Sequence, residues 1–285
     1  MGKDSDPLPA AMQEPGPHGF PMRWVLFVRG CKTLKMGTST DSPIHYIKWH
    51  TFRKSKPWQT MHASAHKADK SLPLVAIYKP KIGWFRRPRD FAIQLFDKAG
   101  KPSERIDMKR TEASNILLGN TAKEYQFTMR TGADGHMETF CWRKRGWGSH
   151  CDEIQLIHKE ADPPVHTGDS RPPRKEGFHF STPYDGWILV RLNGGRRNND
   201  PVKPLGYTDE GGEEIVASWC RASGWVAARK IIFQFWGAAG TGELGEEFTR
   251  IAALSGTTIW DDEEREAQRR RNKNNSSVTI GGGGN

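Results

Sequence analysis

The sequence lacks a secretion signal, and it lacks any apolar run long enough to cross a bilayer. The N-terminal stretch MGKDSDPLPAAM has neither the basic n-region nor the apolar h-region of a signal peptide. The apolar run from Trp24 to Val28 is far shorter than the roughly 20 residues that a transmembrane helix needs. We therefore expect an intracellular protein, cytoplasmic, with the membrane periphery or the nucleus as alternative locations.

Cysteine is scarce, and its spacing excludes the common cysteine-based frameworks. The four cysteines, Cys31, Cys141, Cys151 and Cys220, form no CxxC pair and are not densely spaced as in small secreted scaffolds. We expect free thiols. Cys141, His150 and Cys151 fall one ligand short of a closed zinc site, and their spacing matches no zinc finger.

Histidine offers one other pattern that could bind a metal. His62 and His66 would share a face if residues 61–70 formed a helix, but the zincin glutamate and a third ligand are missing. A surface helix or loop without metal is the favoured interpretation, and we expect neither a metal nor a cofactor.

Catalytic signatures are missing as well. The chain has no G-x-S-x-G elbow, no Walker loop and no G-x-G-x-x-G after a strand. The glycine-rich stretch 237–242 follows a predicted strand but lacks the lysine that reaches a phosphate, and Glu243, Glu246 and Glu247 already occupy the start of the next helix. We expect this stretch to turn the chain, and we expect a protein that is not an enzyme.

Large apolar side chains are missing from both ends of the chain. Residues 1–22 carry five prolines, and residues 272–285 are polar and end in four glycines, so both are predicted to be disordered tails. Residues 23–271 are then one domain. Within it, long loops rich in proline, glycine and charge are expected near 160–178 and 193–213.

Between the tails, apolar and polar residues alternate with a period of two, which predicts half-buried strands. Turn residues at 97–100, 133–135 and 222–224 favour hairpins. A succession of hairpins predicts a mainly β fold, an antiparallel meander closed into a barrel. The predicted strands are 24–29, 74–78, 91–96, 105–108, 125–130, 137–142, 153–157, 187–192, 214–219 and 225–236.

One segment near the C-terminus breaks this period. From Phe248 to Trp260 the residues are apolar or small on nearly all sides, which is typical of a helix buried all round. Gly256 costs roughly 1 kcal/mol of helix propensity but permits close approach of a strand. The next residues, DDEEREAQRRR, can pair at i and i+4, so the helix is predicted to leave the interior and continue into solvent.

This order of elements resembles the tubby C-terminal-like superfamily, which includes tubby, the phospholipid scramblases and the LURP-one-related proteins. The likeness spans about 74–271 and rests on the hairpin FAIQLFDKAGKPSERIDMKR, the strand WVAARKIIFQFW and the helix 248–260 with its charged exit. It implies a closed barrel around a central hydrophobic helix and, as in lipid-binding members, cations that hold phosphoinositide headgroups. The calcium-binding loop and membrane-spanning helix of the scramblases are missing, so scrambling is not implied.

A basic aromatic loop is the strongest candidate binding site. The stretch YKPKIGWFRRPRD, residues 78–90, suits an anionic membrane surface, where rings insert at headgroup level and cations meet phosphates. A second run, CWRKRGWGSHC, forms another edge if it lies beside the first, although Trp142 belongs rather to the core. The candidate ligand-binding residues are Lys79, Lys81, Trp84, Phe85, Arg86, Arg87, Arg89, Arg143, Lys144 and Arg145.

Charge alone leaves several partners open. The net charge is +10 and the pI about 9.5, which favours anionic partners in general. We expect a non-enzymatic module that binds acidic phospholipid headgroups as a peripheral membrane protein. The alternatives are nucleic-acid binding on the same surface, a protein-interaction scaffold that uses Arg269 to Arg271, and the interpretation that the loop is solvated surface.

Overall fold

Most described residues between Arg23 and Phe235 lie in strands, as the period-two pattern predicts. The structure is a computed structural model that describes residues 16, 20–28, 33–38, 43–50, 57–63, 72–79, 90–115, 120–145, 186–192, 207–209, 211–221 and 229–278. The strands are β1 (Arg23–Val28), β2 (Thr33–Gly37), β3 (Pro43–Trp49), β4 (Gln59–His62), β5 (Pro73–Tyr78), β6 (Phe91–Phe96), β7 (Pro102–Asn115), β8 (Asn120–Thr131), β9 (His136–Arg145), β10 (Gly186–Leu192), β11 (Glu214–Arg221) and β12 (Arg229–Phe235).

The strands form a closed antiparallel barrel. Each strand pairs with its neighbours in the sequence, and β1 also pairs with β12, with Trp24 opposite Phe233 at this seam. Closure removes the free edges that an open sheet would expose. The β6–β7 and β8–β9 hairpins turn at Gly100 and Gly135, whose φ values of 76° and 63° suit glycine. Both turns lie where the sequence predicts them.

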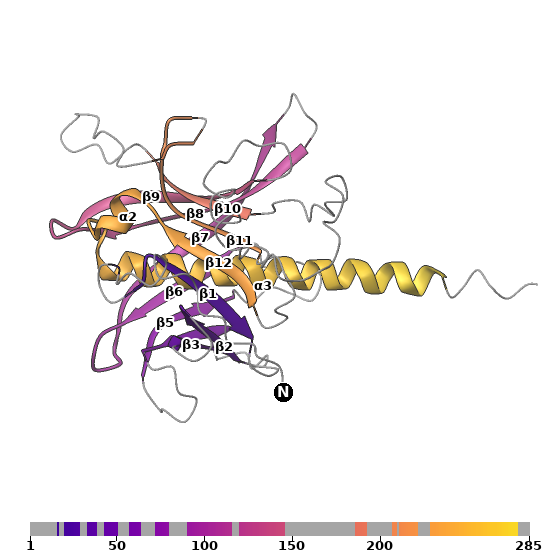
Figure 1. The fold of residues 1–285 in the computed structure, drawn as a ribbon, viewed down its shortest axis with the longest axis horizontal. Coiled ribbons are helices and arrows are strands. Elements are labelled where there is room, and N and C mark those ends of the chain that lie inside the picture. Colours follow the sequence, from indigo (N-terminus) through magenta and orange to yellow (C-terminus); the bar gives the residue numbers. More distant parts are fainter. Residues whose placement is uncertain are drawn as a thin grey trace, which may run out of the picture.

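A long helix fills the axis of the barrel. From β12 the chain passes through the short helix α2 (Gly237–Thr241) into α3 (Gly245–Val278), which runs between the strands and out of the barrel (Figure 1). Residues 248–261 of α3 are buried, except Arg250, which is half-buried. The fold class predicted from the sequence, a meander closed around a buried C-terminal helix, is therefore confirmed.

Contacts from several sides hold the buried part of α3. Phe140 of β9 lies 4.6 Å from Phe248 between ring centroids. The indole N–H of Trp142 donates to Ser255 Oγ at 3.0 Å. From β4, on another part of the wall, Gln59 accepts a hydrogen bond from Thr258 at 2.7 Å. The polar groups within α3 thus find partners inside an apolar core.

The structure differs from the predicted elements in several places. Strands β2, β3 and β4 were not predicted. Because β4 includes Met61 and His62, these two residues are not helical, while 64–70 lie outside the described residues. Phe20, placed in the N-terminal tail, is buried and stacks on His45. The helix α3 extends to Val278, into the range predicted as a tail, because its backbone hydrogen bonds are satisfied within the helix itself. The predicted strand 153–157 and the loop 160–178 lie outside the described residues.

Candidate functional site

The antiparallel order sorts the connections between strands into two ends. Every odd-numbered strand ends, and the next strand begins, at the end where α3 leaves the barrel; we call this the exit end. At the opposite end α3 enters, where the Gly132 N–H donates to the carbonyl of Leu244 at 3.3 Å. The hairpins β6–β7 and β8–β9 also lie at that opposite end. The two ends therefore expose different parts of the sequence.

Three connections that begin and end at the exit end are basic in sequence. They join β1 to β2, β3 to β4 and β5 to β6, which are consecutive strands in the wall. Residues 29–32, 51–56 and 80–89 lie outside the described residues. The flanking strands still show where on the barrel wall each connection begins and ends. Their sequences hold no Asp or Glu, and their cations are Arg29, Lys32, Arg53, Lys54, Lys56, Lys81, Arg86, Arg87 and Arg89. We call these three connections the basic arc.

At the exit end, α3 is held by a set of ion pairs that we call the collar. As the helix leaves the core, its carboxylates meet cations on four strands, β7, β8, β9 and β11, and Lys79, which directly follows β5. Such pairs are partly shielded from water and are worth more than fully exposed ones. The pairs are Asp262 with Lys79 at 3.3 Å, Glu263 with Lys144 at 2.6 Å, Glu264 with Arg221 at 2.5 Å, and Glu266 with Lys123 at 2.5 Å and Arg110 at 3.8 Å.

Lys79 is the most enclosed of the predicted site cations that the structure describes. Its Nζ lies 4.0 Å from the ring centroid of Trp58 and 5.2 Å from that of Phe91, a cation–π arrangement. Burial lowers the pKa of Lys79, while Asp262 and Asp261 act to raise it. This lysine therefore stabilises α3 where the helix leaves the barrel, and its charge is already paired with Asp262.

The same tryptophan also contacts the helix. The indole N–H of Trp58 donates to Asp261 Oδ2 at 3.1 Å, and the guanidinium of Arg265 lies 4.5 Å from the Trp58 ring. Burial raises the pKa of Asp261, although Arg265 on the next turn acts in the opposite sense. Trp58 thus joins the wall to α3 by ring contacts and a hydrogen bond together.

The second basic run lies apart from the first along the wall. Arg143 and Lys144 are on β9, and three strands, β6, β7 and β8, separate β9 from β5. Arg143 pairs with Glu124 at 3.5 Å and also with Asp209, and Lys144 belongs to the collar. The described ends of the two runs therefore lie on strands that are not neighbours, although both are at the exit end. Arg145 is the last residue of β9; Lys81, Trp84, Phe85, Arg86, Arg87 and Arg89 lie outside the described residues.

A pocket of about 250 Å³ lies beside the basic arc. It is lined on β5, β6 and β7 by Tyr78, Lys79, Asp90, Phe91, Ala92, Arg105, Asp107 and Lys109. Lys79 and Asp90 flank the basic connection 80–89, so the pocket lies at the base of that connection. The sequence did not single out Arg105 and Lys109, because they look like ordinary residues on the outer face of an alternating strand.

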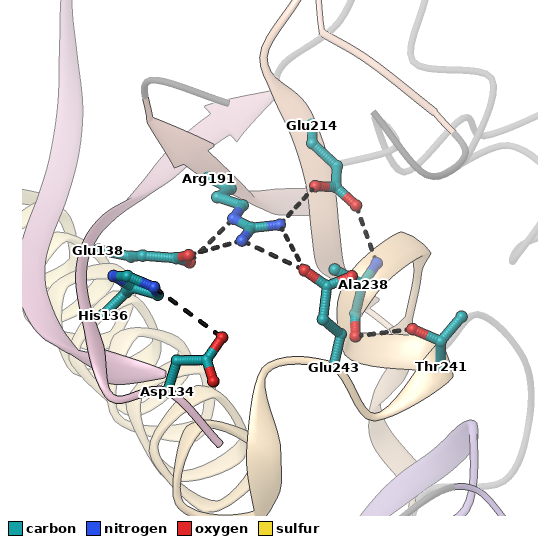
Figure 2. A network of polar contacts seen from close by, with 8 residues as sticks. All are labelled: Asp134, His136, Glu138, Arg191, Glu214, Ala238, Thr241 and Glu243. Carbon is teal, nitrogen blue, oxygen red and sulfur yellow. Dashed lines mark hydrogen bonds and ion pairs between the residues drawn. The ribbon is translucent and has the colours of Figure 1, made fainter. Parts of the chain in front are cut away.

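The opposite end holds a buried polar network of another kind. Figure 2 shows Arg191 of β10 facing Glu138 of β9, Glu214 of β11 and Glu243 of the α2–α3 connection, at 2.6, 3.3 and 3.5 Å. Glu214 also accepts a hydrogen bond from the Ala238 N–H at 2.8 Å. Although burial acts to lower it, the pKa of Arg191 is raised by Glu138 and Glu214. The network fastens the turn into α3 to the wall.

Histidine and cysteine are the side chains that most often bind a metal or act as a nucleophile. His62 faces Thr60, whose Oγ1 lies 3.0 Å from His62 Nε2 and 3.0 Å from His50 Nε2, while His66 lies outside the described residues. Within the described ranges, no group of three or more His, Cys, Asp or Glu side chains is placed to hold a metal ion. Cys141 and Cys220 are buried, and burial with nearby Glu124 raises the pKa of the Cys141 thiol to about 12.

Among the described helices, none combines the length and the apolar character needed to cross a membrane. No protein-family model matches the chain, and no curated protein and no solved structure matches it either.

Proposed function

We propose that the protein is a non-enzymatic module that binds acidic phospholipid headgroups through its exit end, as a peripheral membrane protein of the tubby C-terminal-like type. The observation that carries the proposal is the basic arc: three connections between consecutive strands contain cations and no acidic residue. Their flanking strand ends lie together at the exit end. A charge of one sign on one side of a protein attracts and orients it toward an anionic surface.

Aromatic residues within the same connections favour a membrane. Phe52, Trp84 and Phe85 accompany the cations in sequence. Aromatic rings are enriched at headgroup level, where the apolar ring and the polar surroundings are both accommodated. Each cation near an anionic leaflet contributes about 1 kcal/mol, so the basic arc alone suffices for reversible attachment.

The filled barrel directs a ligand to the outside of the wall. Because α3 occupies the axis with buried side chains, a headgroup would bind at the rim. The pocket beside the arc offers Arg105 and Lys109, both exposed, with the phenol of Tyr78 close by. Arginine and lysine are the side chains that bind phosphate oxygens most strongly. We propose this pocket as the place where one headgroup phosphate is held.

The test is vesicle co-sedimentation at physiological salt, with neutral, phosphatidylserine-containing and phosphoinositide-containing vesicles. The arc variant Arg86→Gln, Arg87→Gln, Arg89→Gln removes three cations and leaves Lys79 intact, because Lys79 is needed for the collar. The matched control Lys98→Gln, Lys101→Gln, Arg130→Gln removes three exposed cations at the opposite end. We expect the parent and the control to bind anionic vesicles and the arc variant to bind at least tenfold more weakly.

Equal binding by the arc variant and the parent would refute this site.

Nucleic acid would use the same cations and rings, since bases stack on Trp and Phe while phosphates meet arginine. A competition assay separates the two partners. If a single-stranded oligonucleotide displaces the protein from vesicles at much lower phosphate concentration than the lipid itself, the lipid proposal is wrong and the nucleic-acid alternative is favoured.

A further inference from the structure

The helix α3 continues well beyond the wall of the barrel. The ion pairs of the collar end at Glu266, which contacts Arg110 and Lys123. From there to Val278 the helix runs for another twelve residues, or about 18 Å at 1.5 Å per residue. Residues 268–273 are exposed, and Figure 1 shows this part of the helix projecting away from the strands. We call residues 268–278 the projecting segment.

The projecting segment carries charge of one sign. Arg269, Arg270, Arg271 and Lys273 are all exposed, and the sequence from Ala267 to Asn285 contains no Asp or Glu. Arg270 lies 3.9 Å from Glu266 on the preceding turn, at the edge of the collar. These cations point to several sides of the helix, because successive residues are about 100° apart. No apolar stripe accompanies them, which disfavours docking into the apolar groove of a protein partner.

The direction of the helix limits how the exit end can meet a flat membrane. The projecting segment leaves the barrel along its axis and from the same end as the basic arc. If the barrel stood upright on the membrane, the helix would be driven into the lipid, and its four cations would enter hydrocarbon at high cost. If the barrel axis is inclined, the same cations reach the lipid phosphates.

We propose that the projecting segment is a second contact with the anionic lipid surface, and that the protein docks with its barrel axis inclined so that this helix lies along the headgroups. The inference rests on the proposed function, since it concerns the same partner and the same end of the barrel. It assigns the partner by charge: a surface of lipid phosphates, contacted by arginines that a polar helix holds at fixed spacing.

The experiment compares three variants on phosphatidylcholine vesicles with and without phosphatidylserine. The helix variant is Arg269→Gln, Arg270→Gln, Arg271→Gln; the arc variant and the opposite-end control are those defined above. Each removes three cations, so a general effect of net charge is equal in all. We expect the helix variant to bind at least tenfold more weakly than the parent, and the control to stay within about twofold. Circular dichroism confirms that all three fold.

Hydrogen exchange of the bound parent protein gives an independent measure of the orientation. On anionic vesicles, amides of the projecting segment should exchange at least several-fold more slowly than in the free protein, whereas the 97–101 hairpin at the opposite end should not change. If the parent binds and the arc variant loses binding while the helix variant and its exchange are unaffected, the proposed function stands and this inference is overturned. If the parent binds no anionic vesicle, both are overturned.

Discussion

At the scale of single residues, His45 joins the barrel wall to Phe20, which precedes the first strand. Its ring lies inside the wall and stacks on Phe20, with ring centroids 4.5 Å apart. Nδ1 donates to the carbonyl of His62 at 3.1 Å, which leaves Nε2 buried and without a hydrogen-bond partner among the described residues. A proton on Nε2 would be desolvated and unpaired, so the neutral ring is strongly favoured.

The environment of His45 predicts that the folded protein loses stability as the pH falls. Burial, with a smaller effect of Arg250, lowers the pKa of His45 from 6.5 to about 4, while the hydrogen bond to the His62 carbonyl and, to a smaller extent, Glu246 act in the opposite sense. Between these two values the unfolded state binds the proton and the folded state does not, so stability is complete above pH 6.5 and falls toward pH 4. The loss attributable to His45 is about 3 kcal/mol. Urea unfolding from pH 7 to pH 4 should show a smaller loss in His45→Phe than in the parent; equal losses would contradict the assignment.

Arg191 is a second single residue on which the stability of the fold depends. It is 2% exposed and is the shared partner of three glutamates, of which Glu214 is also 2% exposed. Replacing it with methionine keeps the aliphatic volume but leaves buried carboxylates without their cation. We expect Arg191→Met to lower the free energy of unfolding by about 3–5 kcal/mol. Arg105→Met, whose partner Asp107 lies 3.8 Å away on the surface, should change it by less than about 0.5 kcal/mol. Similar losses in both variants would contradict the role of the network.

At the scale of elements, the close packing of α3 against the barrel wall depends on glycine at position 256. A Cβ at position 256 would lie 2.9 Å from Phe233 Cε2, 3.2 Å from Trp219 Cδ1 and 3.3 Å from Trp142 Cζ2. These side chains come from β12, β11 and β9, which confirms that Gly256 permits close approach to the wall. An aromatic ring held by other rings in a filled core has little room to move away.

We therefore expect Gly256→Ala to destabilise the protein, although alanine is the better helix former. Overpacking costs typically 1–3 kcal/mol, against a gain of about 1 kcal/mol in helix propensity. A net loss of about 1 kcal/mol, measured by urea unfolding, is the expected result. An increase in the free energy of unfolding would show that the surrounding rings yield.

The collar predicts coupling between the wall and the helix. Lys144 and Glu263 lie 2.6 Å apart with half-buried side chains. A double-mutant cycle with Lys144→Met and Glu263→Gln should give a coupling energy of about 1 kcal/mol that declines with added salt. The matched cycle on the exposed pair Arg105 and Asp107 should give a value close to zero. Indistinguishable values in the two cycles would mean that the collar does not hold α3 more firmly than surface charges do.

The elements could be predicted from the sequence where one face of a strand is buried and the other is not. Strands β6 and β8 show this alternation clearly, and the apolar character of 248–260 indicated a buried helix. Strand β3 was missed because three successive residues, His45, Tyr46 and Ile47, are buried on both faces, and β4 because it has only four residues. The collar and the Arg191 network could not be predicted, since each joins residues far apart in the sequence that look like ordinary surface charges.

At the scale of the whole molecule, the two ends of the barrel differ in charge and in construction. The exit end combines the basic arc with the collar, whereas the opposite end fixes the entry of α3 through Arg191 and its glutamates. The collar pairs Lys79 with Asp262 and Lys144 with Glu263, so these two cations are already used within the protein. The sequence indicated the basic loop, but its position beside two other basic connections follows only from the order of strands in the wall.

Filling the barrel with α3 also makes the wall and the buried helix one cooperative unit. Side chains of β4, β9, β11 and β12 all contact residues 255–258, so the helix cannot leave without exposing the core of the wall. Beyond Glu266 the collar ends and residues 268–273 are exposed, and an exposed polar helix is only marginally stable. We therefore expect the buried part of α3 to be strongly protected from hydrogen exchange and the projecting segment to be weakly protected.

Native-state hydrogen exchange of the free protein measures this difference directly. Amides of residues 252–261 should exchange only through global unfolding, with the same free energy as those of β9 and β12 in the wall. Amides of the projecting segment should exchange by local fraying, at least 10³-fold faster, because opening them breaks no packing. Gly256→Ala should accelerate exchange of both the buried helix and the wall by an equal factor, and should leave the projecting segment unchanged. Faster exchange in the buried helix alone would show that α3 can loosen while the barrel stays closed, and the two would then not fold as one unit.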